Sequence, residues 1–346
     1  MQQCISLAKL GFGNVAPNPM VGCVIVHQNI IIGEGYHQQY GEAHAEVNAI
    51  NAVKDKNLLK ESTLYVNLEP CAHFGKTPPC SNLIIEYQIP KVVIGCIDSF
   101  SEVSGKGIAK MEKAGIEVTV GVLETESLEL NNRFFTFHTK RRPYIILKWA
   151  QTQDGFIDVD RDSCSLSGAE MEQPLDNWIT TPSSKKIVHK WRSQEQAIMV
   201  GTNTAFNDNP QLNVREAEGK NPLRIVLDLN LRLPNNLHLF DKTIPTLVFN
   251  TLKNKTENNL EFVKIEKDHL IPQILKELYQ RDIQSVIIEG GAQLLNTFIK
   301  ENLWDEARVF TGIKTFKKGL QAPQINKKAT NINTIETDIL TTYHNA

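Results

Sequence analysis

Residues 63–80 read TLYVNLEPCAHFGKTPPC, and upstream of them residues 44–50 read HAEVNAI. The apolar, β-branched run TLYVNL predicts a strand that ends just before Pro70. HAEVNAI lies at the start of a predicted helix over residues 43–53. A strand preceded by a helix is typical of a layered α/β sheet, which we predict for this part of the chain.

Three side chains in these two segments are candidate zinc ligands, namely His44, Cys71 and Cys80. One imidazole and two thiolates leave the fourth tetrahedral position open for water, as a catalytic zinc requires. Glu46, two residues from His44, can carry protons without binding the metal. This pattern matches the signature of zinc deaminases, His-x-Glu followed by Pro-Cys and a second Cys. A structural zinc site with His73 as fourth ligand, or unrelated core cysteines, are the alternatives.

Outward from these segments, short β-branched runs alternate with helical stretches over residues 21–120. This alternation predicts strands and helices stacked in an α/β fold. A helical pattern follows over 123–137, and the basic, proline-containing stretch 140–143 indicates a linker. We therefore predict two domains, residues 1–142 and residues 143–346, each long enough to bury its own core.

The second half repeats the α/β pattern, with predicted strands YIILKWAQT, AIMVG, LRIVLDL and TLVFN. Residues 231–243 and 254–259 are polar and are predicted to be surface loops. No GxGxxG segment follows a predicted strand, which argues against a classical dinucleotide fold. Gly290 and Gly291 separate a predicted strand from a helix, and backbone amides at such a turn can hold a phosphate. Taken alone, a diglycine turn is more often structural.

The composition of the 346 residues excludes several classes of protein. The formal charge is −2 and the hydrophobic fraction is 41%, which argues against a nucleic-acid partner and against disorder. No run of about 18 apolar residues and no secretory signal is present, so we expect no membrane partner and a cytoplasmic location. The remaining cysteines, Cys4, Cys23, Cys96 and Cys164, are expected to be core residues or inert thiols.

Longer motifs resemble one family across nearly the whole chain. EPCAHFGKTPPC, APNPMVG at 16–22 and GEAHAEVNAI at 41–50 resemble the deaminase half of the bifunctional riboflavin-biosynthesis deaminase/reductase family. KWAQTQDG, WIT, VHKWRS, AIMVGTNTAFNDNPQLNVR and IIEGGAQLL resemble, in order, its reductase half. The resemblance implies a cytidine-deaminase-like three-layer α/β/α domain followed by a dihydrofolate-reductase-like α/β domain. It also implies Zn²⁺ and NADPH as cofactors.

The resemblance assigns roles to individual residues. Glu46 is expected to be catalytic, beside the metal ligands His44, Cys71 and Cys80. Expected substrate contacts are Asn18, His37, His73 and Lys76 in the first half, and Asp176, Arg192, Leu212, Arg215 and Glu289 in the second. Expected cofactor contacts are Ala150, Trp178, Thr204, Asp208 and the turn from Gly291. Asp176 departs from the family pattern, which usually has a serine there.

By this resemblance the chain performs two steps on a ribosylated diaminopyrimidinone 5′-phosphate, a hydrolytic deamination and an NADPH-dependent reduction of the ribosyl group. Three alternatives stay open. One is a nucleobase or nucleic-acid deaminase with an accessory domain, although no basic, aromatic-rich groove is evident. The others are a zinc-stabilised binding protein and a chain active in only one half. A homo-oligomer is also compatible with the sequence.

Overall fold

The computed structural model describes residues 1–72, 78–98, 105–159 and 177–345. The chain divides into two compact units, Met1–Arg142 and Pro143–Ala346. Three residues with predicted site roles, His73, Lys76 and Asp176, lie outside the described residues, as does Cys164. Within the described ranges, no helix combines the length and the apolar character that crossing a membrane requires.

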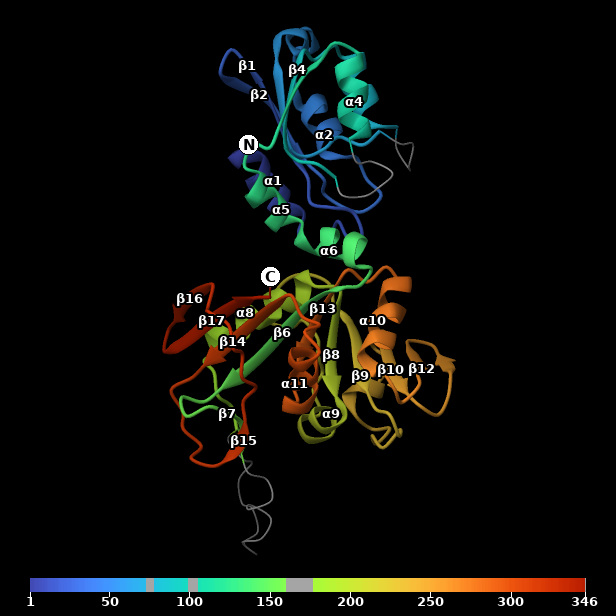
Figure 1. Ribbon diagram of the computed structural model, residues 1–346, viewed down its shortest axis with the longest axis vertical. Helices are drawn as coiled ribbons and strands as arrows, with labels where there is room; N and C mark the ends of the chain where they lie inside the picture. Colours follow the sequence, from blue (N-terminus) through green and yellow to red (C-terminus); the bar gives the residue numbers. More distant parts are fainter. Residues whose placement is uncertain (73–77, 99–104, 160–176, 346) are drawn as a thin grey trace, which may run out of the picture. The chain divides into compact units, whose positions relative to one another are not determined.

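The first unit, in the upper part of Figure 1, is built on a five-stranded sheet. Its strand order is β2-β1-β3-β4-β5. The β1 strand pairs antiparallel with β2 and β3, whereas β3, β4 and β5 are parallel. The strands are β1 (Gly22–His27), β2 (Ile30–Tyr36), β3 (Thr63–Leu68), β4 (Lys91–Cys96) and β5 (Glu117–Val120). The helices are α1 (Gln2–Ala8), η1 (Lys9–Gly11), α2 (Ala45–Ala52), η2 (Lys56–Glu61), α3 (Cys80–Glu86), α4 (Lys106–Lys113), α5 (Glu124–Leu130) and α6 (Asn132–Lys140).

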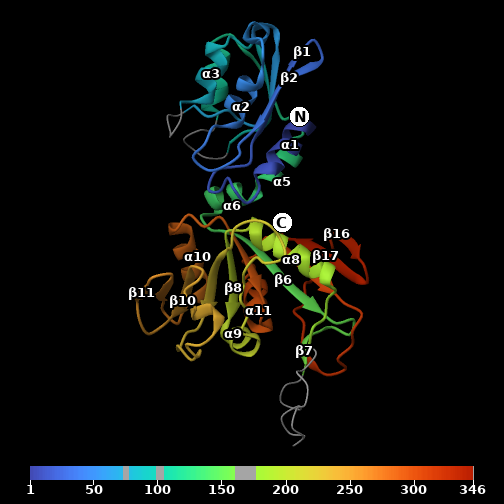
Figure 2. The ribbon, with the colours of Figure 1, turned by 180° about the vertical axis from the view of Figure 1, so that it is seen from behind.

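Helices cover both faces of this sheet. The α3 helix contacts both α2 and α4 on one face, and α1 and α5 contact each other on the opposite face (Figures 1 and 2). Apolar side chains of β1, β3 and β4, such as Ile25, Leu64 and Ile94, are fully buried against Ile50 of α2 and Ile84 of α3. The first unit is therefore the predicted three-layer α/β/α domain, in which the central strands β1, β3 and β4 are buried between two helical layers.

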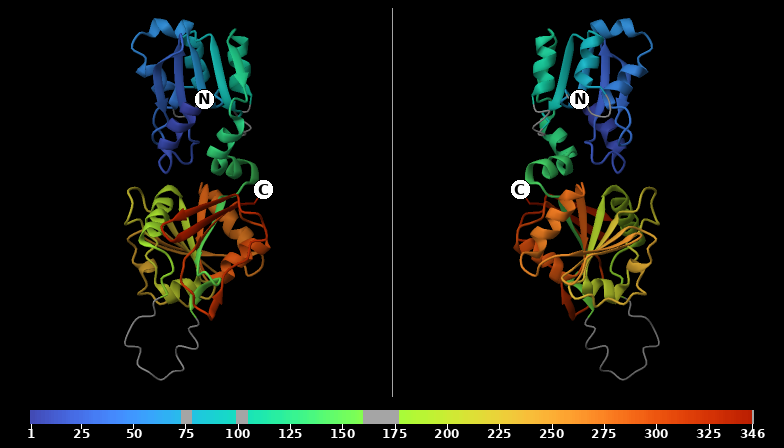
Figure 3. Two further views of the ribbon diagram at one scale, coloured as in Figure 1. Left: turned by 90° about the vertical axis from the view of Figure 1, so that its left-hand side faces the viewer. Right: turned by 90° about the vertical axis from the view of Figure 1, so that its right-hand side faces the viewer.

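The second unit contains a ten-stranded sheet with the order β11-β12-β10-β9-β8-β13-β6-β14-β17-β16. Figure 2 labels its two edge strands, β11 and β16, and Figure 3 shows the same unit from two further directions. Neighbours from β12 to β14 pair in parallel, and the strands at both edges pair antiparallel. The strands are β6 (Tyr144–Gln151), β8 (Ala197–Gly201), β9 (Leu223–Leu227), β10 (Thr246–Asn250), β11 (Lys255–Glu257), β12 (Leu260–Lys264), β13 (Ser285–Glu289), β14 (Glu306–Thr311), β16 (Asn331–Ile335) and β17 (Asp338–His344). A separate small sheet joins β7 (Phe156–Val159) to β15 (Gly319–Gln321).

Alternate residues of the central strand β6 enter different cores. Ile145 and Leu147 pack in a cluster with α10 (Leu270–Gln280) and α11 (Ala292–Lys300), whereas Ile146 packs in the cluster of α9 (Thr202–Asp208). The α8 helix (Pro182–Gln194) adds Val188 and Trp191 beside β14 and β17, and η3 (His238–Phe240) is a short turn. Because both faces of the sheet are buried, its central strands appear in the sequence as continuous apolar runs.

Candidate functional site

The three candidate zinc ligands lie at the ends of secondary-structure elements of the first unit. His44 immediately precedes α2, Cys71 follows the carboxyl end of β3, and Cys80 is the first residue of α3. His44 Nδ1 lies 3.3 Å from Cys80 Sγ and 3.7 Å from Cys71 Sγ. All three candidate ligand atoms lie within 4.8 Å of one another.

These separations fit one tetrahedral zinc ion. Zinc to sulfur and zinc to nitrogen bonds of about 2.3 and 2.0 Å place ligand atoms roughly 3.5 to 3.8 Å apart. The backbone N–H of Cys80 donates to Cys71 Sγ at 3.3 Å. The side-chain hydrogen bond between the two cysteines is the main cause that lowers the pKa of Cys71 to about 4, and the same bond raises the pKa of Cys80. A thiolate is the metal-binding form of cysteine, so the site is electrostatically prepared for a cation.

Glu46 lies in the first turn of α2 and its side chain is only 3% exposed. Burial, followed by the negative charge of Cys71, raises the pKa of Glu46 to about 7. Its carboxyl group hydrogen-bonds with Cys80 and does not belong to the three-residue cluster among the described residues. Glu46 thus lies next to the candidate ligand Cys80, and its catalytic role stays a prediction.

Asn18 and His37 are brought together next to His44. Asn18 Nδ2 lies 3.1 Å from His37 Nε2, and His37 Nδ1 lies 3.1 Å from the carbonyl oxygen of Ala43. A carbonyl only accepts, so the His37 proton is on Nδ1 and Nε2 accepts from the amide of Asn18. The rings of His37 and His44 have centroids 5.5 Å apart. His37 therefore borders the candidate metal ligands, and Asn18 contacts His37.

Glu69, which sequence reasoning did not single out, links the metal segment to α4. Its buried carboxylate accepts backbone N–H groups of Gly105 and Gly107, each at 3.0 Å. Gly107 is required there, because an added Cβ would lie 2.1 Å from the carbonyl oxygen of Pro70. The only signal in the sequence is an acidic residue directly before the Pro-Cys pair.

The second unit contains a cavity of about 2030 Å³ at the carboxyl ends of its parallel strands. In open parallel sheets, ligands commonly bind at this edge. The described residues with predicted roles in this half all line the cavity, namely Ala150, Trp178, Arg192, Thr204, Asp208, Leu212, Arg215, Glu289 and Gly291.

The diglycine turn between β13 and α11 forms part of the cavity wall. Gly290 and Gly291 have φ values of +83° and +36°, which side-chain-bearing residues rarely adopt. The N–H of Gly291 donates to Thr204 Oγ1 at 2.7 Å, so two predicted cofactor residues touch each other. The turn places backbone amides at the start of a helix, where a phosphate group is stabilised.

A buried charge cluster lies deeper in the cavity. Arg192 Nη2 pairs with Glu289 Oε2 at 2.6 Å, and both residues line the cavity. Burial opposes ionisation of Glu289, but the charges of Arg192 and Lys148 outweigh it and hold its pKa at about 2. Lys148, on β6, has its pKa lowered by burial and by Arg192. Sequence reasoning missed Lys148, although a lone lysine inside the apolar run YIILKWA was the available signal.

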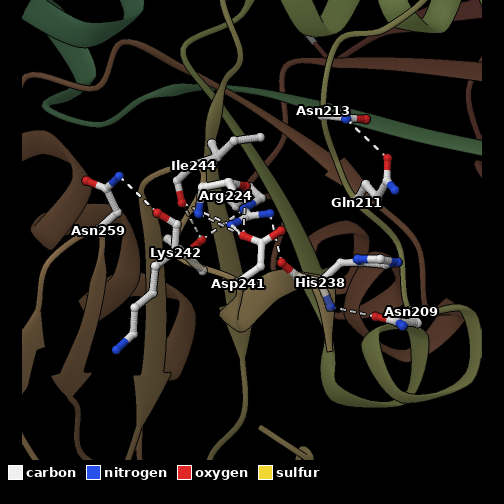
Figure 4. A network of polar contacts seen from close by, with 11 residues as sticks. Asn209, Gln211, Asn213, Arg224, His238, Asp241, Lys242, Ile244 and Asn259 are labelled. Atoms are coloured by element: carbon white, nitrogen blue, oxygen red, sulfur yellow. Dashed lines mark hydrogen bonds and ion pairs between the residues drawn. The ribbon is translucent and has the colours of Figure 1, made fainter. Parts of the chain in front are cut away.

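A second missed residue, Arg224 on β9, organises the loop at the edge of the cavity. Its side chain is 1% exposed, donates to the carbonyls of His238 and Ile244, and pairs with Asp241 at 2.8 Å (Figure 4). His238 lines the cavity, and its N–H donates to Asn209 Oδ1 at 2.8 Å. The buried side chain of Arg224 therefore fixes the backbone of His238, which lines the cavity.

Comparison with known proteins identifies the family. Residues 143–316 match the family model of the RibD C-terminal domain, and residues 1–96 match that of the cytidine and deoxycytidylate deaminase zinc-binding region. The riboflavin biosynthesis protein RibD of Aquifex aeolicus is 41% identical over 92% of this chain and 88% of its own length. This chain belongs to the RibD family. The Synechocystis member is 39% identical over 93% of this chain and 86% of its own.

Solved structures of the RibD family agree with this assignment. The deaminase/reductase of Thermotoga maritima, described as acting on diaminohydroxyphosphoribosylaminopyrimidine and on 5-amino-6-(5-phosphoribosylamino)uracil, superposes with a TM-score of 0.87. It is 38% identical, and the match covers 99% of this chain and 97% of that one. Acinetobacter baumannii RibD gives a TM-score of 0.85 at 31% identity, over 99% and 96% of the two chains.

Family membership makes this chain a bifunctional enzyme of riboflavin biosynthesis, with a zinc-binding deaminase domain and an NADPH-dependent reductase domain. The predicted fold classes are confirmed for both units. The alternative of a non-catalytic zinc-stabilised binding protein is excluded, because the RibD relatives of this chain are deaminase/reductase enzymes.

Proposed function

We propose that residues 1–142 deaminate 2,5-diamino-6-(5-phosphoribosylamino)pyrimidin-4(3H)-one and that residues 143–346 then reduce its ribosyl group to ribityl. The observation that carries the proposal is the convergence of His44, Cys71 and Cys80 beside the buried carboxyl group of Glu46. The reductase assignment is supported by the cavity whose lining includes the predicted cofactor and substrate residues.

In the deamination, Glu46 accepts protons from the attacking water and delivers one to the ring nitrogen and one to the amino nitrogen, which leaves as ammonia. His44, Cys71 and Cys80 would hold a zinc ion, which would supply the Lewis acidity that activates water at neutral pH. Asn18 offers both a donor and an acceptor to the pyrimidine edge, and His37 orients its amide through their 3.1 Å contact. The ring carbon that carried the amino group becomes a carbonyl.

In the reduction, a hydride and a proton add across the C1′–nitrogen bond of the ring-opened ribosyl imine. NADPH supplies the hydride when bound, and its phosphates suit the amides of the Gly290–Gly291 turn. The protein's own task is positioning, because the cavity residues bind both reactants in contact. The charge cluster of Lys148, Arg192 and Glu289 offers fixed polar partners in a site shielded from water.

Glu46→Gln tests the division of labour. The variant should keep one zinc per chain but lose ammonia release by a factor of about 10² to 10⁴, since it has no proton carrier. NADPH oxidation with the deaminated intermediate should be unchanged. Glu61→Gln, at an exposed carboxylate of the same unit, is the matched control. Loss of both activities in folded, zinc-loaded Glu46→Gln would refute the proposal.

A coupled assay that follows ammonia and NADPH in the unaltered protein distinguishes the full proposal from a chain active in only one half. We further propose that the partner is this small phosphorylated pyrimidine and not a nucleic acid, in keeping with the formal charge of −2. A cytoplasmic location and a homo-oligomeric state stay predictions, to be checked by fractionation and by light scattering.

A further inference from the structure

His189 lines the reductase cavity but was not among the residues predicted to act there. It lies on α8, one turn before Arg192 and one turn after Lys185, and all three line the cavity. This spacing puts them on one face of the helix. The His189 side chain is buried, at 2% exposed. A buried histidine on the ligand-facing side of a helix requires a physical explanation, because burial of a polar ring is unfavourable unless it is hydrogen-bonded.

The hydrogen-bond partner of the His189 ring is a backbone amide. The N–H of Arg215 donates to His189 Nδ1 at 3.2 Å. A backbone N–H cannot accept, so Nδ1 is unprotonated and the ring is the neutral tautomer with its proton on Nε2. Burial, and then the charges of Arg192 and Arg215, lower the pKa of His189 to about 4, which keeps the ring neutral at physiological pH. The imidazole is thus a fixed acceptor for one particular amide.

Three cations border the cavity on α8 and on the segment that carries Arg215, and carboxylates form ion pairs with two of them. Lys185 pairs with Glu216 at 2.6 Å, and Arg192 pairs with Glu289 at 2.6 Å. Among the described residues, Arg215 makes no ion pair; its Nη1 donates only to the neutral Asn213 Oδ1 at 2.8 Å. Arg215 is therefore the guanidinium of this face whose donors are not engaged by a carboxylate, the property that a phosphate anchor needs.

The segment that carries Arg215 is held away from its relaxed conformation. Leu212 has a φ of +49°, and such backbone persists only where surrounding contacts enforce it. Arg192 Nη1 donates to the carbonyl of Asn213 at 3.2 Å, and the N–H of Val214 donates to Asn221 Oδ1 at 2.7 Å. A third hydrogen bond, from the N–H of Arg215 to His189 Nδ1, restrains the backbone of the arginine itself.

We propose that His189 is a positioning residue for the reductase substrate: through Nδ1 it fixes the backbone of Arg215, so that this guanidinium meets the substrate's phosphate group. The inference rests on the proposed function, because it takes the reductase substrate to be a phosphomonoester. Arg192 has a different role, because its charge is already paired with Glu289. From α8 it donates to the carbonyl of Asn213 and so stabilises the segment that carries Arg215.

Two amide substitutions separate this role from simple packing. In His189→Asn the amide oxygen lies near the position of Nδ1 and can accept from Arg215, whereas in His189→Gln the amide lies near the position of Nε2. His189→Asn should keep the KM for the phosphorylated, deaminated intermediate within about twofold. His189→Gln should raise it about tenfold, the effect of losing one hydrogen bond, with kcat unchanged. Lys190→Gln, exposed on the same helix, is the control.

Two further measurements tie the effect to Arg215 and to phosphate. The KM increase in His189→Gln should disappear with the dephosphorylated intermediate as substrate, and also in the Arg215→Ala background, where no guanidinium is left to position. If His189→Gln does not fold, an about tenfold higher KM in folded His189→Asn still overturns the inference.

Equal KM values in the Asn and Gln variants, a change confined to kcat, or a KM increase that persists in Arg215→Ala would overturn it as well. Failure of the unaltered protein to oxidise NADPH with the deaminated intermediate would instead refute the proposed function. The two failures are therefore distinguishable.

Discussion

Ionisable side chains in the reductase cavity are held in defined protonation states by their neighbours. Glu289 stays charged because Arg192 and Lys148 lie beside it, whereas His189 stays neutral because it is buried among Arg192 and Arg215. Each shift is also a statement about stability, since a group whose pKa differs between the folded and unfolded states makes folding depend on pH.

For His189 the sign follows from its lowered pKa. Between pH 6.5 and about 4 the unfolded chain protonates this ring and the folded chain does not, so the contribution to stability falls as the pH falls through this window. We expect His189→Asn, which keeps the acceptor but cannot titrate, to lose less in melting temperature from pH 7 to pH 4.5 than the unaltered protein. Thermal melts of both proteins at matched ionic strength would test this, and identical pH profiles would contradict it.

At the scale of elements, the metal site depends on how closely α2 approaches the sheet. Gly35 on β2 leaves room for this contact, because a Cβ there would lie 2.4 Å from the backbone nitrogen of Ala49. The helix begins beside His44 and carries Glu46, so its distance from the sheet sets where both side chains lie. The positions of His44 and Glu46 therefore depend on the close packing of α2 against β2.

Gly35→Ala should push α2 outward. We expect it to destabilise the first unit by about 1 to 3 kcal/mol, the usual effect of overpacking, and to weaken zinc retention against a chelator. Urea denaturation and zinc release would measure the two effects. Glu34→Gln, on the exposed side of the same strand, is the control. Unchanged zinc retention in a destabilised Gly35→Ala protein would show that the position of α2 does not govern the site.

At the scale of the whole molecule, each unit has its own buried core and its own predicted reaction. Residues 1–142 and residues 143–346, produced as separate chains, should each unfold cooperatively and keep one half-reaction, because no core cluster spans both units among the described residues. Calorimetry and the two separate assays would measure this.

A fragment of residues 1–122 lacks α5 and α6 and serves as the control, since α5 packs against β3 and β4. It should be far less stable than residues 1–142. If residues 1–142 or 143–346 aggregate or lose their half-reaction, the predicted boundary is wrong or the units depend on each other for folding.

Much of the first unit could be predicted from the sequence because its signals are local. Zinc restricts its ligands to a few residue types, so His44, Cys71 and Cys80 were recognisable before their positions were known. Apolar runs that are buried on both faces likewise identified the central strands. The prediction from local sequence was wrong at one edge of the second sheet. Residues 254–259 were expected to form a loop, but β11 lies there and pairs with β12. An edge strand exposes polar side chains and therefore resembles a loop in sequence.

Only the tertiary structure decided how Lys148, His189, Arg192, Arg215 and Glu289 meet. They come from β6, α8, the segment after α9, and β13, and are neighbours because β13 lies between β8 and β6 in the sheet. The two arginines, both expected to contact the substrate, have different partners for the same reason. A residue pattern specifies which side chains a strand presents to each face. The order of the strands depends on the packing of the whole domain, so the sequence alone could propose individual site residues but not the contacts among them.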